Sequence, residues 1–395
     1  MGEATLRERA IGLLTASGRS DVPPFMVMDV MAAAARIEAA GGHVIHMEVG
    51  QPAAPAPKSA ILAAHAALDG ARIDYTSALG IPSLRQRISR HYRETYGFAV
   101  DSERIIVTTG SSGAFILGFL AMFEPGDRVA VTVPGYPPYR HILTALGCEA
   151  VMIETSSENR HALTGEALLA AHRKAPLKGV LVGSPANPTG TMMSREALTG
   201  LIAASDSAGI RFISDEIYHG LDYAFPAVSA IELSSDALAI NSFSKYFCMT
   251  GWRVGWMVVP ESLVRPIERL QQNLAISVPT LSQIAAEAAF EGRAEMEAVK
   301  RGYEENRRIL IEGLPRAGLT KFLPADGAFY LYADVSDFTS DSFKFAGEML
   351  EKAHVAATPG IDFDPLYGHR FIRFSYARSA SEMREAVERI ARWLG

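Results

Sequence analysis

Short apolar segments alternate with helical segments between residues 104 and 242, and this alternation constrains the fold more than any other feature of the sequence. Strands are expected at residues 104–108, 128–133, 150–153, 179–182, 210–213 and 238–241, and helices at 114–123, 139–146, 165–171 and 194–207. Repeated strand–helix–strand units are typical of parallel strands joined by crossover helices. The sequence therefore predicts an α/β fold whose main sheet is mostly parallel and has helices on both faces.

The segments on either side of this region predict a second, smaller unit. Helices are expected at 6–17, 28–40, 57–68 and 82–96, a strand at 43–49, and a helical region at 263–311 that is interrupted near Pro279 and Gly292. Beyond Pro315, strands are expected at 326–332 and 371–375 and helices at 342–353 and 381–394. A chain of 395 residues exceeds what one small core organises. We expect a large domain at residues 46–312 and a small α+β domain formed by residues 1–45, which include an N-terminal arm, together with residues 313–395.

Composition excludes several classes of function. A net charge of −6 offers no basic patch for nucleic acid or an anionic membrane. The longest apolar stretch, residues 114–123, is too short to cross a bilayer, and the N-terminus lacks the apolar core of a signal peptide. The two cysteines, Cys148 and Cys248, supply neither a disulfide framework nor a metal cluster. We therefore expect a cytoplasmic globular protein without a metal and without nucleic-acid or membrane partners.

Polar residues follow the ends of the predicted strands. In parallel α/β sheets, ligands bind beyond the carboxyl ends of the strands, so side chains at these ends are expected to share one crevice. The residues concerned are Ser111, Ser112, Tyr136, Asn187, Asp215, Tyr218 and Lys245. Residues far apart in the sequence are thus predicted to form a single site.

Lys245 follows an apolar strand and is surrounded by hydroxyl groups and an arginine. Partial burial lowers the pKa of an ammonium group, which makes a neutral, nucleophilic amine available. Ser242, Ser244 and Arg253 lie in the same stretch. A single lysine in a loop is usually a surface residue, whereas a lysine with two hydroxyls and an arginine suits an aldehyde that carries a phosphate.

The segment from Gly110 to Gly113 places free backbone N–H groups at the start of a helix, where an anion is stabilised. Taken alone, this segment indicates only a helix start. Together with Arg253, whose guanidinium can hold a phosphate through two hydrogen bonds, it indicates a phosphate site.

Asp215 has two interpretations. It forms an exposed acidic turn with Glu216, or it faces a pyridine nitrogen and keeps that nitrogen protonated. In the second case Tyr218 and Asn187 could hydrogen-bond the phenolic oxygen of the ring. Tyr136, which lies between prolines, either packs internally or stacks on the same ring.

Arg373 lies in an apolar strand, residues 371–375. A buried arginine is costly unless it meets an anion. An internal Asp or Glu is one such partner. A bound carboxylate is the other, and a charge-assisted contact of this kind contributes roughly 1.5 to 3 kcal/mol.

In order and spacing, these motifs resemble the fold-type I pyridoxal-5′-phosphate aminotransferases of classes I and II, similar to those that act on aspartate, aromatic or neutral amino acids. The resemblance extends from Pro23-Pro24-Phe25 to the strand of Arg373. It implies that Lys245 of SFSK forms the Schiff base with the cofactor, and that Asp215 and Tyr218 of DEIY hold the ring. The other cofactor contacts that it implies are Gly110, Ser111, Ser112, Tyr136 of PGYP, Asn187 of NPTG, Ser242, Ser244 and Arg253, and the implied substrate contacts are Arg373, Asn187 and Gly50 of VGQP.

The resemblance also implies an assembly and a reaction. Tyr75 resembles a tyrosine that reaches the phosphate in a neighbouring subunit, which implies a homodimer with shared active sites. The implied reaction moves an amino group between an L-amino acid and a 2-oxo acid, with Lys245 transferring the Cα proton. A pyridoxal-phosphate-dependent β-eliminating lyase needs the same lysine, aspartate and arginine and is one alternative. A non-catalytic ligand-sensing module is another.

The substrate side chain stays open at this point. Family members specific for dicarboxylates use an additional cation for the distal carboxylate, and no residue of this sequence is assigned to that role. The apolar arm at residues 23–28, which contains Phe25, would favour neutral or aromatic side chains at the entrance to the site.

Overall fold

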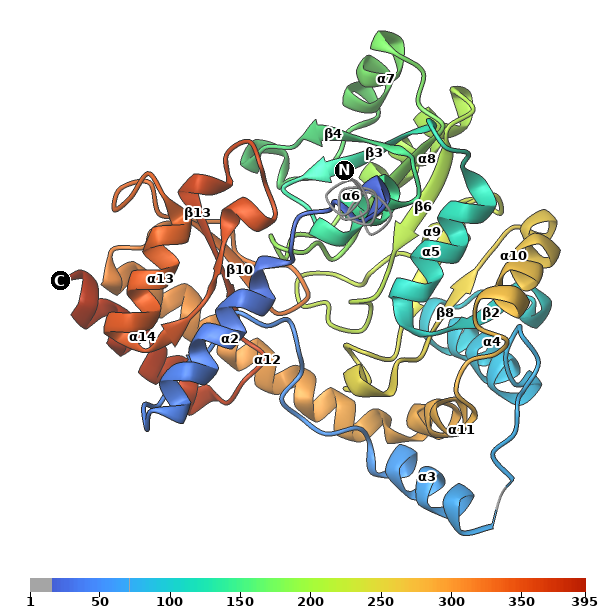
Figure 1. The fold of residues 1–395 in the computed structure, drawn as a ribbon, viewed down its shortest axis with the longest axis horizontal. Helices are drawn as coiled ribbons and strands as arrows, with labels where there is room; N and C mark the ends of the chain where they lie inside the picture. Colours follow the sequence, from blue (N-terminus) through green and yellow to red (C-terminus); the bar gives the residue numbers. More distant parts are fainter. Residues whose placement is uncertain (1–15, 71) are drawn as a thin grey trace, which may run out of the picture.

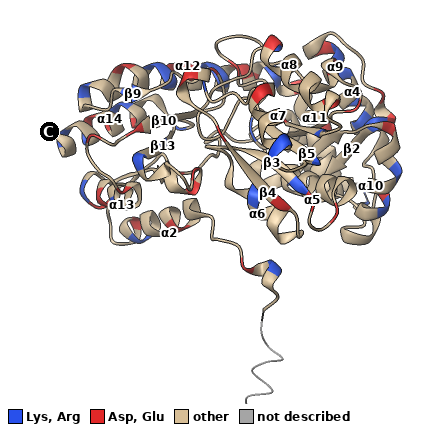
Figure 2. Cartoon of the chain, turned by 90° about the horizontal axis from the view of Figure 1, so that it is seen from above, with Lys and Arg blue, Asp and Glu red and all other residues tan. Residues whose placement is uncertain are grey.

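The computed structural model describes residues 16–70 and 72–395, and these residues form a large helix-covered sheet with a smaller unit beside it (Figure 1). The helix predicted at residues 6–17 lies outside the described residues except for its last two, which are not helical. None of the helices in the described ranges has the length and apolar character needed to cross a bilayer. Lys and Arg are interspersed with Asp and Glu over the helices of both units (Figure 2).

The large sheet has seven strands in the order β2-β8-β7-β6-β5-β3-β4. They are β2 (Ile105–Thr108), β3 (Arg128–Val133), β4 (Glu149–Glu154), β5 (Gly179–Gly183), β6 (Arg211–Asp215), β7 (Leu238–Ser242) and β8 (Gly255–Val258). The strands from β4 through β3, β5 and β6 to β7 pair in parallel, whereas β8 runs antiparallel to both β2 and β7. The six strands predicted in this region are confirmed, with ends that differ by at most two residues.

Strand β8 was not predicted. From the sequence no element is assigned to residues 251–258, where only the polar residues around Arg253 are noted. The structure instead turns at the short 3-10 helix η4 (Thr250–Trp252) and returns the chain beside β7 without a crossover helix. A strand inserted in this way has no strand–helix–strand pattern around it, so periodicity alone does not reveal it.

Helices cover both faces of the sheet, as predicted. The flanking helices are α3 (Lys58–Gly70), α4 (Pro82–Tyr96), α5 (Gly110–Met122), α6 (Pro137–Ala145), α7 (Gly165–Lys174), α8 (Arg195–Ser207), α9 (Ala230–Leu233), α10 (Glu261–Leu274) and α11 (Thr280–Ala289). Successive residues of a strand point to opposite faces. Ile106 accordingly packs in one core with Phe115 of α5, whereas Ile105 and Val107 pack in another core with Leu84 of α4.

The smaller unit is built from both ends of the chain, which confirms the predicted α+β region. An antiparallel sheet of order β12-β13-β10-β9 contains β9 (Lys321–Phe322), β10 (Tyr330–Asp334), β12 (Thr358–Pro359) and β13 (Phe371–Ser375). The helices of this unit are α2 (Met26–Ala39), α13 (Ser342–Ala353) and α14 (Ala380–Leu394). Strand β1 (Ile45–His46) pairs in parallel with β11 (Val355–Ala356), and this pairing ties the N-terminal segment to the C-terminal one. The exact domain boundaries, after residues 45 and 312, stay a prediction.

The predicted breaks in the long helical region are confirmed. Helix α11 begins immediately after Pro279, and the long helix α12 (Arg293–Gly313) begins after Gly292, which closes the 3-10 turn η5 (Phe290–Gly292). Helix α12 leads from the large unit to the small one (Figure 1). Proline and glycine interrupt helices because one lacks an N–H group and the other has a flexible backbone.

Two predicted strands begin too early or extend too far. Residues 326–332 do not form one strand, because β10 begins only at Tyr330. The preceding backbone docks on other segments instead, with the N–H groups of Asp326 and Gly327 bonded to the Gly190 carbonyl at 2.8 and 2.9 Å. The strand predicted at 43–49 is limited to Ile45–His46, and the residues that follow it turn into the crevice described below.

Candidate active site

A cavity of about 230 Å³ lies beyond the carboxyl ends of the parallel strands. It brings together most of the residues that the sequence placed at strand ends. Its lining includes Gly50, Ser111, Ser112, Tyr136, Asn187, Asp215, Tyr218, Ser244, Lys245, Arg253 and Arg373. Three of the proposed site residues, Tyr75, Gly110 and Ser242, are not among the lining residues. The predicted convergence of strand ends is therefore present in the fold.

Lys245 projects into this cavity from the turn that follows β7. Its Nζ donates a hydrogen bond of 2.6 Å to the carbonyl oxygen of Gly50. Burial lowers the pKa of the Lys245 ammonium to about 8, with Arg373 and Arg253 acting in the same direction and Asp215 opposing them. With this pKa about a tenth of the amine is neutral at pH 7, far more than for an ordinary lysine.

Gly50 is required at its position because the backbone approaches a side chain closely. A Cβ atom on this residue would lie 1.8 Å from the hydroxyl oxygen of Tyr330. Any other residue would have to displace either the segment or the Tyr330 side chain.

Asp215 ends strand β6 and is only 3% exposed. Tyr139 donates a hydrogen bond to its Oδ2, and the Ile217 backbone N–H donates to its Oδ1 at 3.1 Å. Burial raises the pKa of Asp215 to about 6, against the effect of the Tyr139 hydrogen bond. At neutral pH the carboxylate is therefore ionised inside the cavity, next to the Lys245 ammonium.

The alternative reading of Asp215 as part of an exposed acidic turn is wrong, because Glu216 is also buried and faces elsewhere. The Glu216 carboxylate accepts hydrogen bonds from the Ser229 hydroxyl and from the Ala230 backbone N–H, the latter at 2.8 Å. Glu216 thus anchors the start of helix α9, and of these two carboxylates only Asp215 lines the cavity.

Aromatic side chains form the walls of the cavity, and two of them, Tyr139 and Tyr330, were not predicted from the sequence. The hydroxyl groups of Tyr218 and Tyr330 are 2.7 Å apart, and burial raises the pKa of Tyr218 well above its usual value. Tyr136 makes T-shaped contacts with Tyr139, at a centroid distance of 5.2 Å, and with Phe25, at 6.0 Å. Tyr139 is close to Tyr136 in sequence and could have been suggested by that proximity, but no local signal marks Tyr330.

At one end of the cavity, the start of α5 meets Arg253. Ser111 and Ser112 lie in the first turn, where backbone N–H groups have no carbonyl of the helix to bond. A Cβ atom at Gly110, whose φ is +65°, would lie 2.5 Å from Nη2 of Arg253, so glycine lets the guanidinium rest against the helix start. The concentration of N–H donors and positive charge makes this end of the cavity suited to an anion.

Ser242 and Ser244 differ in their relation to this anion-binding end. Ser244 lines the cavity, whereas Ser242 is buried behind it. The Ser242 hydroxyl donates to Oγ of Ser244 at 2.9 Å and accepts from the Ser244 backbone N–H at 3.1 Å. The geometry of Ser242 is that of a residue that orients the turn carrying Ser244 and Lys245.

Arg373 is 1% exposed and also lines the cavity. Its guanidinium is held between the rings of Tyr330 and Phe363, at 4.5 and 4.6 Å from their centroids. It donates hydrogen bonds to Asn187 Oδ1 at 2.9 Å, to Thr358 Oγ1 at 3.2 Å and to the backbone carbonyl of Glu48.

All of these acceptors of Arg373 are uncharged. Within residues 16–70 and 72–395, Arg373 forms no ion pair with an Asp or Glu side chain, and its Nε has no hydrogen-bond partner. The internal carboxylate considered from the sequence is therefore not the explanation for this arginine. A buried cation that is oriented but not neutralised by the described chain is a binding group for an anion.

Tyr75 lies away from this cavity, with its side chain 79% exposed. The loop that carries it is fixed by Gln283, which donates to Thr76 Oγ1 at 2.9 Å and accepts from the Ile81 N–H at 2.8 Å. Exposed apolar side chains of Ile73 and Ile276 also occur at this end of the molecule. An ordered loop thus presents an aromatic ring to the outside.

Comparisons with known proteins agree with this geometry. A family model described as aminotransferase class I and II matches residues 42–390. The chain is 48% identical over 380 residues to the valine–pyruvate aminotransferase of Mycobacterium tuberculosis, with 95% of this chain and 97% of that protein covered.

Solved structures give the same result. The crystal structure of an aminotransferase from Mycobacterium tuberculosis has a TM-score of 0.94 at 47% identity and covers 96% of this chain and 99% of that one. Aspartate aminotransferase from Thermus thermophilus with maleate has a TM-score of 0.89 at 31% identity, with 96% and 99% covered. These relatives give no support to the lyase or to the non-catalytic sensing module. The chain belongs to the class I and II aminotransferases, enzymes that use pyridoxal 5′-phosphate to move an amino group between an amino acid and a 2-oxo acid.

Proposed function

We propose that this aminotransferase exchanges the amino group of a neutral, apolar L-amino acid such as valine with a small 2-oxo acid such as pyruvate. The observation that carries the proposal is the set of cations around the cavity. Among the described residues that line it, the basic ones are Lys245, Arg253 and Arg373. They are proposed to bind the cofactor aldehyde, the cofactor phosphate and the substrate α-carboxylate, respectively. Among the described residues of the same subunit, no cation at the cavity is left for a second substrate carboxylate.

The wall contributed by the N-terminal segment is apolar. Phe25, Val27 and Met28 line the cavity at the start of helix α2. An apolar wall gives little discrimination against other apolar side chains, but it disfavours a charged one, whose desolvation it cannot compensate. The relationship to a protein named valine–pyruvate aminotransferase supports the same substrate class.

The residues of the cavity suit pyridoxal 5′-phosphate. Ser111, Ser112, Ser244 and Arg253, together with the N–H groups beside Gly110, would hold the phosphate, because they gather donors and positive charge at the start of α5. Asp215, ionised at neutral pH, would pair with the protonated ring nitrogen. When bound, the cofactor supplies an aldehyde that takes up the amino group and a ring that delocalises the electrons released at the substrate Cα.

The remaining ring contacts come from the walls. Tyr218 and Asn187 would donate hydrogen bonds to the phenolic oxygen, and Tyr136 would lie against the ring face. Ser242 is proposed to act through Ser244, to which its hydroxyl is bonded at 2.9 Å. These assignments use all the cofactor contacts that the sequence resemblance implies within one subunit.

Arg373 would bind the substrate α-carboxylate, with Asn187 and the Gly50 backbone beside it. The guanidinium is already oriented by Thr358 and by two aromatic rings, so little side-chain entropy is lost when the carboxylate arrives. A carboxylate held by Arg373 directs the Cα–H bond of the substrate toward Lys245.

Lys245 is the group that would move the proton at the substrate Cα. A general base works best when its pKa lies near the working pH, and the pKa of this amine is lowered to about 8. The Gly50 carbonyl keeps the amine oriented in the cavity through the 2.6 Å hydrogen bond. The same residue therefore serves as nucleophile toward the cofactor and as base toward the substrate.

We also propose that the enzyme is a homodimer in which Tyr75 of each subunit completes the phosphate site of the other. The exposed ring of Tyr75, its anchored loop and the exposed apolar residues Ile73 and Ile276 support this arrangement. An exposed apolar surface of this kind is typical of a protein contact.

We infer a cytoplasmic location, because both cysteines are free, buried thiols that are compatible with a reducing compartment. Fractionation of cells that produce the native protein would test this inference, and recovery in an exported fraction would contradict it.

The first prediction concerns the reaction of Lys245 with the cofactor. The rate at which the apoenzyme captures pyridoxal 5′-phosphate should rise about tenfold per pH unit below pH 8 and level off above it, because only the neutral amine reacts. Stopped-flow absorbance of the bound cofactor measures this rate, with Lys245→Ala as the control that should show no covalent capture. A rate that keeps rising to pH 10, as expected for an ordinary lysine, would contradict the lowered pKa.

The second prediction concerns Arg373. In Arg373→Lys, kcat/KM for amino acid donors should fall roughly 10- to 100-fold, because two-point binding of a carboxylate is lost. The same substitution at Arg370, a half-exposed arginine paired with Asp334 at 2.7 Å, serves as the control and should have little effect.

A comparison of each amino acid with the amine that lacks its carboxyl group separates carboxylate binding from a general loss of structure. The ratio of the two kcat/KM values should collapse in Arg373→Lys and stay constant in Arg370→Lys. An unchanged ratio in Arg373→Lys would mean that this arginine does not bind the substrate carboxylate.

The third prediction tests the substrate class and the reaction together. With pyruvate as acceptor, kcat/KM for valine should exceed that for aspartate by about tenfold or more, because a second carboxylate would be desolvated without a cation. Formation of the 2-oxo acid from each donor measures the rates. Faster turnover of aspartate would overturn the proposed substrate class, and release of ammonia and pyruvate from an amino acid without any acceptor would indicate elimination instead of transfer.

The fourth prediction concerns the assembly. Sedimentation equilibrium of the holoenzyme should give a mass near twice the 42.6 kDa of the chain. Tyr75→Ala should weaken cofactor binding about tenfold through loss of one phosphate hydrogen bond. Tyr367→Ala, which removes a partly exposed tyrosine of the small unit, should leave it unchanged. A monomeric holoenzyme would exclude the shared site.

A further inference from the structure

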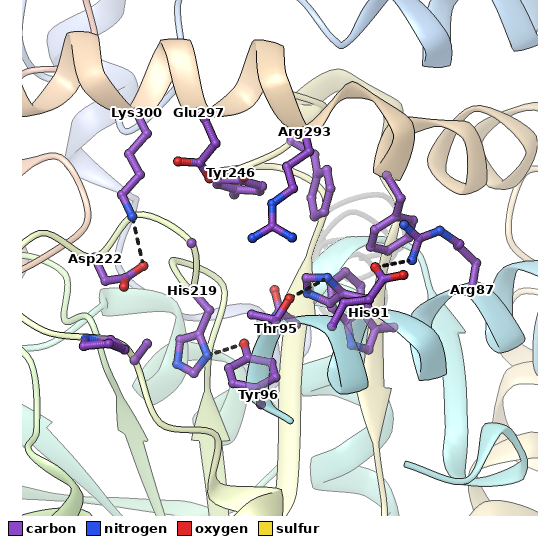
Figure 3. A pocket seen from close by; sticks show the side chains of 18 residues that line it. Arg87, His91, Thr95, Tyr96, His219, Asp222, Tyr246, Arg293, Glu297 and Lys300 are labelled. Carbon is purple, nitrogen blue, oxygen red and sulfur yellow. Dashed lines mark hydrogen bonds and ion pairs between the residues drawn. The ribbon is translucent and has the colours of Figure 1, made fainter. Parts of the chain in front are cut away.

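A second cavity, of about 510 Å³, is lined by His219 and Tyr246, the residues that directly follow Tyr218 and Lys245 in the chain (Figure 3). Its walls come from α4, from the beginning of α12, from the loop after β6 and from the segment after Lys245. It shares no lining residue with the catalytic cavity. Its volume is within the range of small-molecule sites, and the reaction proposed above uses none of the side chains that line it.

The side of the cavity formed by α12 carries both signs of charge. Arg293, Glu297 and Lys300 stand at positions i, i+4 and i+7, so they share one face of the helix, and Figure 3 shows all three side chains directed into the cavity. Glu297 accepts a hydrogen bond of 2.6 Å from the Tyr246 hydroxyl, and Lys300 pairs with Asp222 at 3.4 Å.

These contacts leave one cation and two carboxylate oxygens available to a ligand. Arg293 makes no hydrogen bond or ion pair with any residue of the described ranges. One oxygen of Glu297 and one of Asp222 likewise have no described donor. An unpaired guanidinium therefore faces the same space as two carboxylate oxygens.

The side of the cavity formed by α4 carries one internally paired charge and a neutral histidine. Arg87 pairs with Glu94 at 3.2 Å. His219 Nε2 lies 3.0 Å from the Ser184 carbonyl oxygen, and its Nδ1 lies 2.8 Å from the Tyr96 hydroxyl. Burial lowers the pKa of His91 to about 3, with Arg87 and Arg293 adding to the effect, so the His91 ring is neutral.

A free donor and several aromatic rings also line the cavity. Asn241 is 4% exposed and accepts from the Ser242 N–H at 2.7 Å, while its own amide N–H groups have no described acceptor. Phe247, Trp256 and Phe290 line the cavity beside it. A buried polar group without a partner in a cavity marks a position where a ligand atom can bond.

The balance of charges selects the kind of ligand. Three cations, Arg87, Arg293 and Lys300, and three carboxylates, Glu94, Asp222 and Glu297, line the cavity, so the formal charge sums to zero. An anion would be attracted by Arg293 but repelled by Asp222 and Glu297. A cation would be attracted by the two carboxylates but repelled by Arg293. A molecule that carries both charges satisfies both groups.

We propose that this cavity binds a small zwitterion of the α-amino acid type with an apolar or aromatic side chain. Its carboxylate pairs with Arg293, its ammonium group with Glu297 and Asp222, and its side chain lies against Phe247, Trp256 and Phe290. The proposal is independent of the substrate proposed for the catalytic cavity.

The position of the cavity gives such a ligand access to the catalytic turns. Tyr246 follows Lys245 in the chain, and His219 follows Tyr218. In each pair the first-named residue lines the second cavity and the other lines the catalytic cavity. A ligand bound between Arg293 and Glu297 therefore contacts the two backbone segments that position the catalytic lysine and the ring-binding tyrosine.

Isothermal titration of the borohydride-reduced holoenzyme, which cannot turn over an amino acid, tests the proposal with three probes. L-Phenylalanine carries both charges, 3-phenylpropionate lacks the ammonium group and phenethylamine lacks the carboxylate. L-Phenylalanine should bind saturably, and each of the other two should bind roughly tenfold more weakly or worse, because each leaves one charged wall group unpaired.

Two variants then assign the binding to this cavity. Arg293→Gln should weaken L-phenylalanine and 3-phenylpropionate roughly tenfold and leave phenethylamine unchanged, whereas Glu297→Gln should weaken L-phenylalanine and phenethylamine and spare 3-phenylpropionate. Arg308→Gln, which changes an exposed arginine of the same helix outside the cavity, is the matched control and should bind all three as the native chain does.

Three results would overturn the proposal. They are the absence of saturable L-phenylalanine binding to the native chain, binding that neither variant changes, and 3-phenylpropionate binding as tight as that of L-phenylalanine. The ranking of the three probes is assigned to this cavity only where Arg293→Gln or Glu297→Gln changes it, because Arg373 in the catalytic cavity is also proposed to bind carboxylates.

Discussion

The hydrogen bond between the Lys245 amine and the Gly50 carbonyl is the contact on which the rest of the site depends. It joins the turn after β7 to the segment that leads out of β1, so it connects the large sheet with the part of the chain that pairs with the C-terminal unit. The bond exists because Gly50 has no side chain to collide with the Tyr330 hydroxyl. The Lys245 amine is buried and its hydrogen-bond acceptor is an uncharged carbonyl. Burial therefore lowers the pKa of the ammonium group.

The pKa values of Lys245 and Asp215 are shifted toward each other. Burial acts on both groups, raising the pKa of the acid to about 6 and lowering that of the base to about 8. Between these two values both groups carry charge and attract one another across the cavity. Sites that perform acid–base chemistry near neutral pH commonly hold titratable groups whose pKa values are shifted by burial and by neighbouring charges. Tyr139 restricts the shift of Asp215 by donating a hydrogen bond to its carboxylate.

The same two turns also form part of the second cavity. Neighbouring residues in a turn send their side chains in different directions, so Lys245 and Tyr218 face the catalytic cavity while Tyr246 and His219 face the other. The two cavities treat charge differently. The catalytic one has three cations and one lining carboxylate, which suits a phosphate and a substrate carboxylate, whereas the second one has equal numbers of each sign, which suits a zwitterion.

The sequence by itself determined the mostly parallel sheet, the position of Lys245, Asp215 and Asn187 at strand ends, and their convergence, because alternating periodicity and strand-end chemistry are local properties that place residues at one edge of a sheet. Only the tertiary structure decided that β8 inserts beside β7, that Tyr139 bonds Asp215 and that Tyr330 meets Tyr218. It also decided that Arg373 is oriented by Asn187 and Thr358 instead of an internal carboxylate. These contacts join residues far apart in the chain, and their geometry depends on how whole elements pack, which no local pattern of residues encodes.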